Sequence, residues 1–360
     1  MKTSILLTLS IAIGMQGAES VDWPQWRGPT RDGHFAGPAW PEKLDTNHLK
    51  ESWMRSTPAF DAQSLFVAGM RDVLVGIDAS SGKDLWRFDF VDKLKSPVPD
   101  FGFVCSPLVE GEAVYVQAGA SLVKLNKRTG DWVWRALADK GGMWGSAFSS
   151  PVLAEITGKR QLVVQTREKI AGVDLEDGKV LWEQAIEAFR GMNILTPVLY
   201  KDTLFTSTYG GKSIGYKISQ IGSQFAVTES WTHKSQGYMS TPVVVEGVAY
   251  HHLKSQRVMA IDIQTGRELW TTDQSFGKYW SLISQGNHIL ALDQRGELIL
   301  LKANKEKLER LDERKITDQE TWAHLAMAGH EVFVRELNAL TSYRWEAPTH
   351  GNKGKAQGSL

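Results

Sequence analysis

GIDASSGKDLW (Gly76–Trp86) returns three times along the chain without gaps, as KLNKRTGDWVW (Lys124–Trp134), GVDLEDGKVLW (Gly172–Trp182) and AIDIQTGRELW (Ala260–Trp270). Every copy has Asp or Asn at its third position, Gly at its seventh and Trp at its eleventh. A fifth copy is stretched by an insertion before its Trp. The shared Gly and Trp positions are Gly82, Gly130, Gly178, Gly266, Trp86, Trp134, Trp182, Trp231 and Trp270. Self-similarity at a fixed spacing predicts a repeat architecture.

A second series of residues keeps the same period. The five tryptophans that end the copies are separated by 48, 48, 49 and 39 residues. A Ser-Pro or Thr-Pro dipeptide precedes each copy, and these prolines are separated by 49, 44, 46 and 45 residues. They are Pro58, Pro107, Pro151, Pro197 and Pro242. Because the two series interlock, each repeat is one structural unit with a defined start and end.

Four β-strands fit into one repeat. The Ser/Thr-Pro dipeptide opens the first strand, where the missing N–H of proline costs least. Alternating runs such as AVYVQA (Ala113–Ala118) and RVMAIDI (Arg257–Ile263) predict the second and third strands. An Asp-x-x-Thr-Gly turn follows, and the fourth strand is predicted to end in the Trp, which wedges against the next repeat. Four strands in about 40–50 residues are typical of a β-propeller blade, so the predicted fold class is all-β.

The predicted propeller spans residues 48–345 and has seven blades. The last repeat, from WAHLAMAG (Trp322–Gly329) to ALTSYRW (Ala339–Trp345), supplies only three strands. Its fourth strand is available upstream in HLKESWM (His48–Met54), which places Trp53 where a repeat-ending Trp belongs. An N-terminal strand is therefore expected to close the ring, which removes exposed sheet edges.

These repeats, AxDxxTGxxxW after a Ser-Pro start, resemble the PQQ-like (quinoprotein-type) β-propeller repeat. That group includes PQQ-dependent alcohol dehydrogenases and a non-enzymatic outer-membrane assembly lipoprotein. DWPQWRGPTRDG (Asp22–Gly33) is similar to the N-terminal segment of secreted bacterial proteins of the non-catalytic branch. Eight blades are usual there, whereas Leu49–Phe60 here runs straight from a closing strand into the next blade. Residues 19–47 are expected to pack on the propeller, with Trp23 and Trp26 as anchors.

The composition and the two ends of the chain indicate where the protein is located and which partners it lacks. With 41 basic and 41 acidic residues in 360, the formal net charge is zero, which argues against a nucleic-acid partner. Lys2, the apolar run Ile5–Met15 and small residues after it predict a signal peptide over residues 1–18. The mature protein is then periplasmic or extracellular without a transmembrane span. No lipid anchor is expected, because the only cysteine is Cys105, and residues 346–360 are expected to be a disordered tail.

No catalytic or metal-binding constellation is predicted. The resemblance implies that an active dehydrogenase carries an adjacent cysteine pair against the quinone, calcium-binding Glu, Asn and Asp, and an Asp base. Cys105 is single, and no acidic cluster has calcium-loop spacing. Cys105 is instead expected to be a small buried apolar residue. PQQ therefore stays only as an alternative cofactor.

The loops that lead into each first strand are the candidate binding region, because they surround one mouth of the central channel. Their aromatic or hydrogen-bonding residues are Phe103, Trp144, Phe148, Arg190, Asn193, Tyr238, Lys278, Tyr279, Trp280, Trp322 and His324. These side chains either bind a ligand or partner, or simply fill the funnel and seal adjacent blades.

Three functions remain open on this sequence. The first is a non-catalytic protein-interaction scaffold of the cell envelope with protein partners. The second is a PQQ- or small-ligand-binding oxidoreductase. The third is a polysaccharide-binding propeller, in which exposed Trp144 and Trp280 stack on sugar rings.

Overall fold

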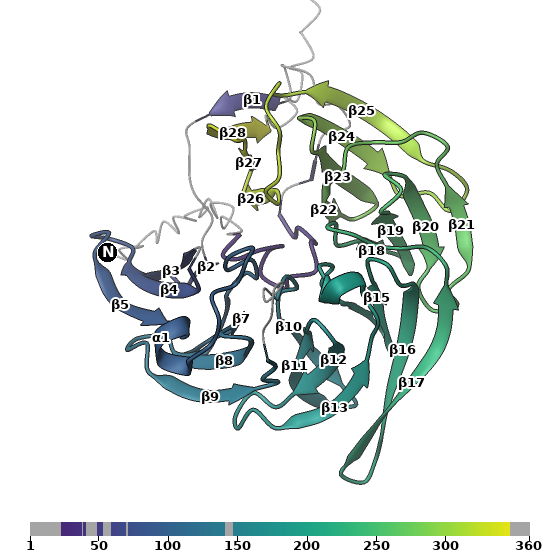
Figure 1. The fold of residues 1–360 in the computed structure, drawn as a ribbon. Coiled ribbons are helices and arrows are strands. Elements are labelled where there is room, and N and C mark those ends of the chain that lie inside the picture. The colour runs from purple at the N-terminus through teal and green to yellow at the C-terminus, as the bar shows by residue number, and fades with distance from the viewer. Residues whose placement is uncertain are drawn as a thin grey trace, which may run out of the picture.

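The repeats form a ring of seven antiparallel sheets, each of four strands, in the computed structural model (Figure 1). The structure describes residues 23–37, 39–40, 49–52, 59–69, 71–140 and 147–345, with residues 49–52 described as backbone. The predicted seven-bladed all-β propeller is confirmed. The predicted signal peptide, Trp53, Pro58, Trp144 and the predicted tail lie outside the described residues.

The first three blades follow one another in chain order, each with its first strand innermost. Blade 1 contains β2 (Ala59–Phe60), β3 (Ser64–Gly69), β4 (Val73–Asp78) and β5 (Asp84–Asp89). Helix α1 (Phe90–Leu94) leads into blade 2, which contains β6 (Leu108–Glu110), β7 (Ala113–Ala118), β8 (Ser121–Asn126) and β9 (Trp132–Ala136). Blade 3 contains β10 (Val152–Ile156), β11 (Lys159–Gln165), β12 (Lys169–Val173) and β13 (Val180–Ala185).

The next three blades repeat this order. A short 3-10 helix, η1 (Phe189–Gly191), precedes blade 4, which contains β14 (Val198–Tyr200), β15 (Thr203–Ser207), β16 (Ser213–Ile221) and β17 (Gln224–His233). Blade 5 contains β18 (Val243–Val245), β19 (Val248–His252), β20 (Val258–Asp262) and β21 (Glu268–Thr271). Blade 6 contains β22 (Trp280–Gln285), β23 (His288–Asp293), β24 (Glu297–Lys302) and β25 (Glu309–Lys315).

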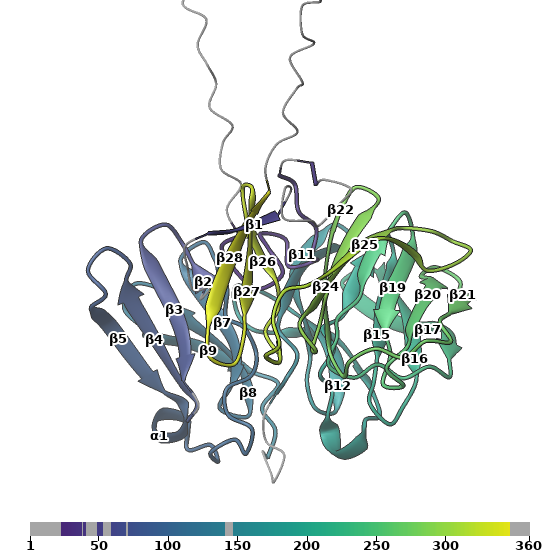
Figure 2. The ribbon, with the colours of Figure 1, turned by 90° about the horizontal axis from the view of Figure 1, so that it is seen from above.

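Blade 7 is built from both ends of the propeller. It contains β26 (Ala326–Ala328), β27 (Glu331–Arg335) and β28 (Leu340–Trp345), and β1 (Leu49–Ser52) is its outermost strand. β1 pairs antiparallel with β28 (Figure 2), so that Leu49 lies opposite Trp345 and Ser52 opposite Ser342. The sequence prediction that an N-terminal strand completes the last blade is therefore confirmed.

The repeat turn is held by its own first side chain and its glycine. Oδ1 of Asp78 accepts a 2.7 Å hydrogen bond from the backbone N–H of Ser81, and the N–H of Gly82 donates to the Asp78 carbonyl at 2.8 Å. Gly82 has a φ of 71°, a conformation in which a side chain is strained. Beyond this turn the fourth strand does not end at the Trp as predicted, because β5 continues for three residues past Trp86.

Apolar side chains fill the junctions between consecutive blades. Six buried clusters join blade 1 to 2, 2 to 3, 3 to 4, 4 to 5, 5 to 6 and 6 to 7. Among the described residues no such cluster joins blade 7 to blade 1. The seventh junction therefore differs from the other six.

Candidate functional site

The N-terminal segment runs through the centre of the ring (Figure 1). Gly33–Phe35 lies parallel to the innermost strand of blade 6. The N–H of Phe35 donates to the Ser284 carbonyl, and the N–H of Ser284 donates to the Gly33 carbonyl, both at 2.7 Å. Trp23 and Phe35 are buried in the core shared by blades 6 and 7. The channel is therefore lined by strands and filled from within by this segment.

Two buried arginines of this segment bind the Ser/Thr-Pro dipeptides that lead into the first strands of distant blades. The guanidinium of Arg27 donates to the carbonyls of Thr241 at 2.9 Å and Pro242 at 2.6 Å. The guanidinium of Arg31 donates to the carbonyls of Ser106 at 3.0 Å and Pro107 at 2.7 Å. Burial lowers the pKa of Arg27 to about 10 and that of Arg31 to about 9. Both stay charged at neutral pH and tie blades 2 and 5 to the channel centre.

Sequence reasoning missed these arginines, although it singled out Trp23 and Trp26 beside them. The signal lies in the spacing of WRGPTR, which holds two cations four residues apart. The ring of Trp26 contacts both, with Cζ of Arg27 at 5.6 Å and Cζ of Arg31 at 5.5 Å from its centroid. Cation–π contacts of this kind stabilise guanidiniums that have left water.

Three of the predicted funnel residues serve the fold. Nδ2 of Asn193 donates to the carbonyls of Thr166 and Arg167, which fixes a loop of blade 3. His324 donates from Nδ1 to the Leu325 carbonyl at 2.9 Å. Burial, followed by the nearby charge of Arg27, lowers the pKa of His324 to about 3, so the ring is neutral.

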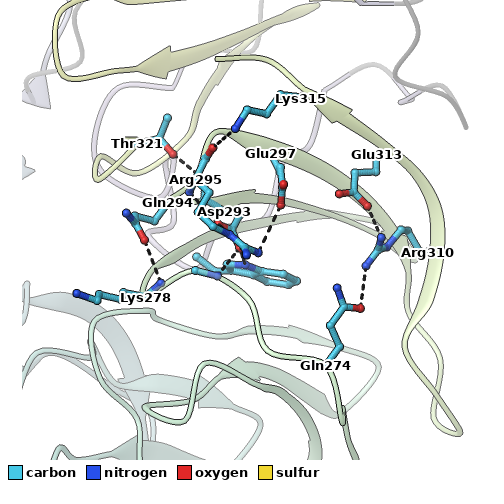
Figure 3. A network of polar contacts seen from close by, with 12 residues as sticks. Gln274, Lys278, Asp293, Gln294, Arg295, Glu297, Arg310, Glu313, Lys315 and Thr321 are labelled. Carbon is cyan, nitrogen blue, oxygen red and sulfur yellow. Dashed lines mark hydrogen bonds and ion pairs between the residues drawn. The ribbon is translucent and has the colours of Figure 1, made fainter. Parts of the chain in front are cut away.

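Trp280 is the third, and it is fully buried. Its indole N–H donates to Oδ2 of Asp293 at 2.8 Å, and the same carboxylate accepts from the N–H of Gly277 and from Arg295 (Figure 3). Burial alone would raise the pKa of Asp293, but these hydrogen bonds outweigh it and lower the pKa. The expectation that Trp280 is an exposed sugar platform is wrong, because its polar edge is committed to this network.

Other predicted funnel residues lie at the surface on the loops before the first strands. Lys278 is exposed, Phe148 is partly buried against Phe101, and Trp322 is 38% exposed beside Tyr279. The described members of the predicted set do not converge on one cavity. They are spread around the rim of the channel mouth.

The most continuous of these surfaces lies between blades 4 and 5, and we call it the aromatic rim. The ring of Tyr209 packs at 4.8 Å on Tyr238 and at 5.5 Å, edge to face, on Phe189. Nζ of Lys254 lies 4.6 Å from the Tyr209 ring, and the guanidinium of Arg190 lies over Phe189 at 5.0 Å. Phe189 is 49% exposed. Exposed aromatic and Arg side chains, such as Phe189 and Arg190, are of the types enriched at protein interfaces.

A cleft of about 730 Å³ lies between blade 7 and blade 1. Blade 1 contributes Val67 and Ala68, and blade 7 contributes Phe333 and Leu340. The cleft is also lined by Trp23 and Trp26 of the N-terminal segment, by residues 103–107 before blade 2, and by His324. It lies at the junction where the described residues form no buried apolar cluster. The short sequence between the closing strand and blade 1 was its only sign in the sequence.

The residues present do not fit a quinone–calcium centre. Cys105 is single and 3% exposed, and its Sγ donates to the Gln117 carbonyl at 3.3 Å. Burial raises the pKa of this thiol to about 12, which makes it inert. The described part of the chain holds no group of three or more His, Cys, Asp or Glu arranged around a metal position. Nor does it contain a helix long and apolar enough to span a membrane.

Comparison with known proteins places the chain in a family. The family model described as outer membrane protein assembly factor BamB matches residues 26–272. The chain belongs to this family. BamB of Yersinia pestis is 23% identical over 266 residues, which are 69% of this chain and 63% of the relative. BamB of Burkholderia pseudomallei is 26% identical over 181 residues, covering 48% of this chain and 43% of the relative. The chain thus spans less than two thirds of the curated BamB relatives it matches.

Solved structures agree on the fold. The crystal structure of BamB from Moraxella catarrhalis superposes with a TM-score of 0.62 at 16% identity, covering 79% of this chain and 82% of that one. A quinohemoprotein alcohol dehydrogenase, ADHIIG from Pseudomonas putida HK5, gives a TM-score of 0.51 at 11% identity over 94% of this chain and 82% of that one. At these identities the likeness concerns the propeller alone, since enzyme and assembly factor share it.

Proposed function

We propose that this chain is a non-catalytic protein-interaction scaffold of the bacterial cell envelope, exported to the periplasm, that works in outer-membrane protein assembly. Membership of the BamB family supports the envelope role, and the predicted signal peptide supports export. No lipid anchor is part of the proposal, because Cys105 is the only cysteine.

The aromatic rim is the observation that carries the scaffold role. Phe189, Tyr209 and Tyr238 form a contiguous cluster of rings in which Phe189 is half exposed, and Arg190 and Lys254 flank it. Aromatic and Arg side chains on a preorganised frame lose little entropy on binding and supply most hot-spot energy at interfaces. The partner proposed for this face is a protein.

A variant of the rim tests this role in envelope preparations. Tagged wild-type protein and Phe189→Ala/Tyr238→Ala are cross-linked in the periplasm and purified, and the adducts are quantified by mass spectrometry. Truncating a hot-spot aromatic costs roughly 2 kcal/mol or more, so we expect at least a tenfold loss of the wild-type adduct.

Trp132→Ala is the matched control, because Trp132 is 52% exposed on blade 2 and belongs to a different surface. It should keep the adduct. A wild-type protein that purifies without any adduct, or a rim variant that keeps it, contradicts the proposal.

Neither of the other functions is proposed. The polysaccharide hypothesis rests on Trp144 and Trp280 as exposed sugar platforms, but Trp280 is buried and Trp144 lies outside the described residues. The PQQ hypothesis needs a cysteine pair that the chain does not have.

A further inference from the structure

A groove of about 660 Å³ lies between blades 4 and 5, beside the aromatic rim. It is lined by residues 233–236 at the exit of β17, by residues 253–255 and Arg257 in the turn between β19 and β20, and by Met259, Glu268 and Thr271. We call it the basic groove. The chain is described without a break from residue 147 to residue 345, which includes both walls. Lys254 belongs to the groove and also contacts the ring of Tyr209, so the groove and the rim form one continuous surface.

Three cations of the basic groove have no carboxylate partner. Lys234, Lys254 and Arg257 are exposed, and no carboxylate of the described residues lies within ion-pair distance of any of them. The ammonium of Lys254 instead lies over the face of the Tyr209 ring. Several charges of one sign in a groove raise the local potential and attract the opposite charge. The basic groove therefore attracts anionic groups, although the formal net charge of the whole chain is zero.

The acidic residue of the groove, Glu268, is already engaged on both oxygens. Its Oε2 lies 3.2 Å from Nε2 of His233, and its Oε1 accepts from the hydroxyl of Thr271 at 2.7 Å. Nδ1 of His233 accepts from the N–H of Ser235, so Nε2 carries the proton that is donated to Glu268. Because this carboxylate is held away from the three cations, their charge stays available to a ligand.

Hydrogen bonds hold the groove in a fixed position relative to the aromatic rim. Oγ of Ser235 lies 2.8 Å from Nδ1 of His233, which fixes the wall from blade 4. The N–H of Lys254 donates to the Gln236 carbonyl at 2.9 Å and joins the two walls. Oε1 of Gln236 accepts from the N–H of Gly210 at 3.2 Å, in the turn that carries the rim. A surface that is ordered before binding loses less entropy when a partner binds.

We infer that the basic groove takes an acidic segment of the partner protein that contacts the aromatic rim. This inference rests on the function proposed above, because it names the chemistry of the partner for the same surface. Unpaired cations favour carboxylates and repel basic segments, which gives the surface its specificity. The ligand is a polypeptide, since only a chain can place an apolar side chain on the rim and carboxylates in the adjoining groove.

The probe is the fluorescein-labelled peptide FGEEEEEG, whose binding to the full-length protein is followed by fluorescence anisotropy. We expect saturable binding. FGQQQQQG keeps the length and the Phe but removes the charges, and it should bind about tenfold more weakly. Because salt screens interactions between exposed charges, raising NaCl from about 50 mM to about 500 mM should weaken binding of the acidic peptide by about fivefold or more.

Lys254→Glu/Arg257→Glu reverses two of the three cations and should weaken binding of the acidic peptide by about tenfold or more. Lys305→Glu/Lys307→Glu is the matched control, because it changes the net charge equally at exposed positions between β24 and β25. It should bind within about twofold of wild type, since it lies outside the groove. Melting temperatures verify that both variants fold. Absence of saturable binding to wild type, equal binding of the two peptides, or equal binding by the groove variant and wild type overturns the inference.

The cross-linked adduct in the periplasm separates this inference from the proposed function. We expect Lys254→Glu/Arg257→Glu to lose the adduct, as Phe189→Ala/Tyr238→Ala does. If only the aromatic variant loses it, the scaffold role stands and the acidic partner is overturned. If only the groove variant loses it, the acidic partner is supported and the role of the aromatic rings is contradicted.

Discussion

His251 is a buried polar residue at a position where other blades have an apolar one. Strand pairing places it on blade 5 where blades 1, 2 and 3 have Val67, Val116 and Val164. It is fully buried, and neither ring nitrogen has a partner in the described structure. Burial, followed by the charge of His252, lowers the pKa of His251 to about 3. The folded protein therefore excludes a proton that the unfolded chain binds below pH 6.5.

His251→Val should consequently flatten the acid dependence of stability. A base whose folded pKa is depressed contributes stability that is full above the unfolded pKa and is lost as pH falls toward the folded pKa. Between pH 8 and pH 5 this residue alone should cost wild type about 2 kcal/mol of unfolding free energy, a loss that the variant avoids. Urea unfolding at both pH values measures the difference. An unchanged pH dependence in the variant would show that the ring is already protonated in the fold.

At the scale of the element, the blade junction was predictable where its parts lie close in sequence. The Asp-to-Gly turn and the Trp four residues later are local, so their spacing alone predicted the hairpin and the wedge. The exception is Trp182, whose N–H donates at 2.6 Å to Gln161 of its own blade. The following blade replaces the short turn by the long β16–β17 hairpin, so the usual acceptor is missing there. An insertion one blade away changed this contact.

Alanine at two turn glycines separates the wedge contact from backbone strain. Gly82 and Gly130 share nearly the same φ, 71° and 73°, so Ala pays a similar conformational cost of about 1 kcal/mol at each. At Gly130 the new Cβ would lie 2.6 Å from the Trp86 ring, whereas at Gly82 it would meet no atom of the described residues within 4 Å. We expect Gly130→Ala to lose about 2 kcal/mol more than Gly82→Ala, through overpacking. Chemical denaturation measures the unfolding free energy of both variants. Equal losses of unfolding free energy would mean that the Trp86 ring moves away from the new methyl group at no cost.

For the whole molecule, the sequence predicted the number of blades and the closing strand but neither the arginine ties nor the cleft. Periodicity describes what each repeat has in common with the others. The bond from Arg27 to Thr241 joins residues 214 positions apart and exists only once the ring has formed. The cleft arises from how the last blade meets the first, where the repeat pattern is interrupted. Both features depend on contacts between blades that are far apart in sequence. The repeat pattern of one sequence therefore cannot predict them.

A disulfide between β1 and β28 tests whether these two strands close the ring. Lys50 of β1 lies directly opposite Arg344 of β28, and such positions suit a cross-strand disulfide. Lys50→Cys/Arg344→Cys also removes the ion pair between Arg344 and Glu331, and buried Cys105 does not compete for oxidation. Because the link encloses the whole propeller, we expect the oxidised form to gain about 3 kcal/mol, seen as a higher melting temperature that dithiothreitol reverses. Lys50→Ser/Arg344→Ser controls for the charges. If the thiols stay reduced under mild oxidant, β1 does not hold this register and the ring is closed in another way.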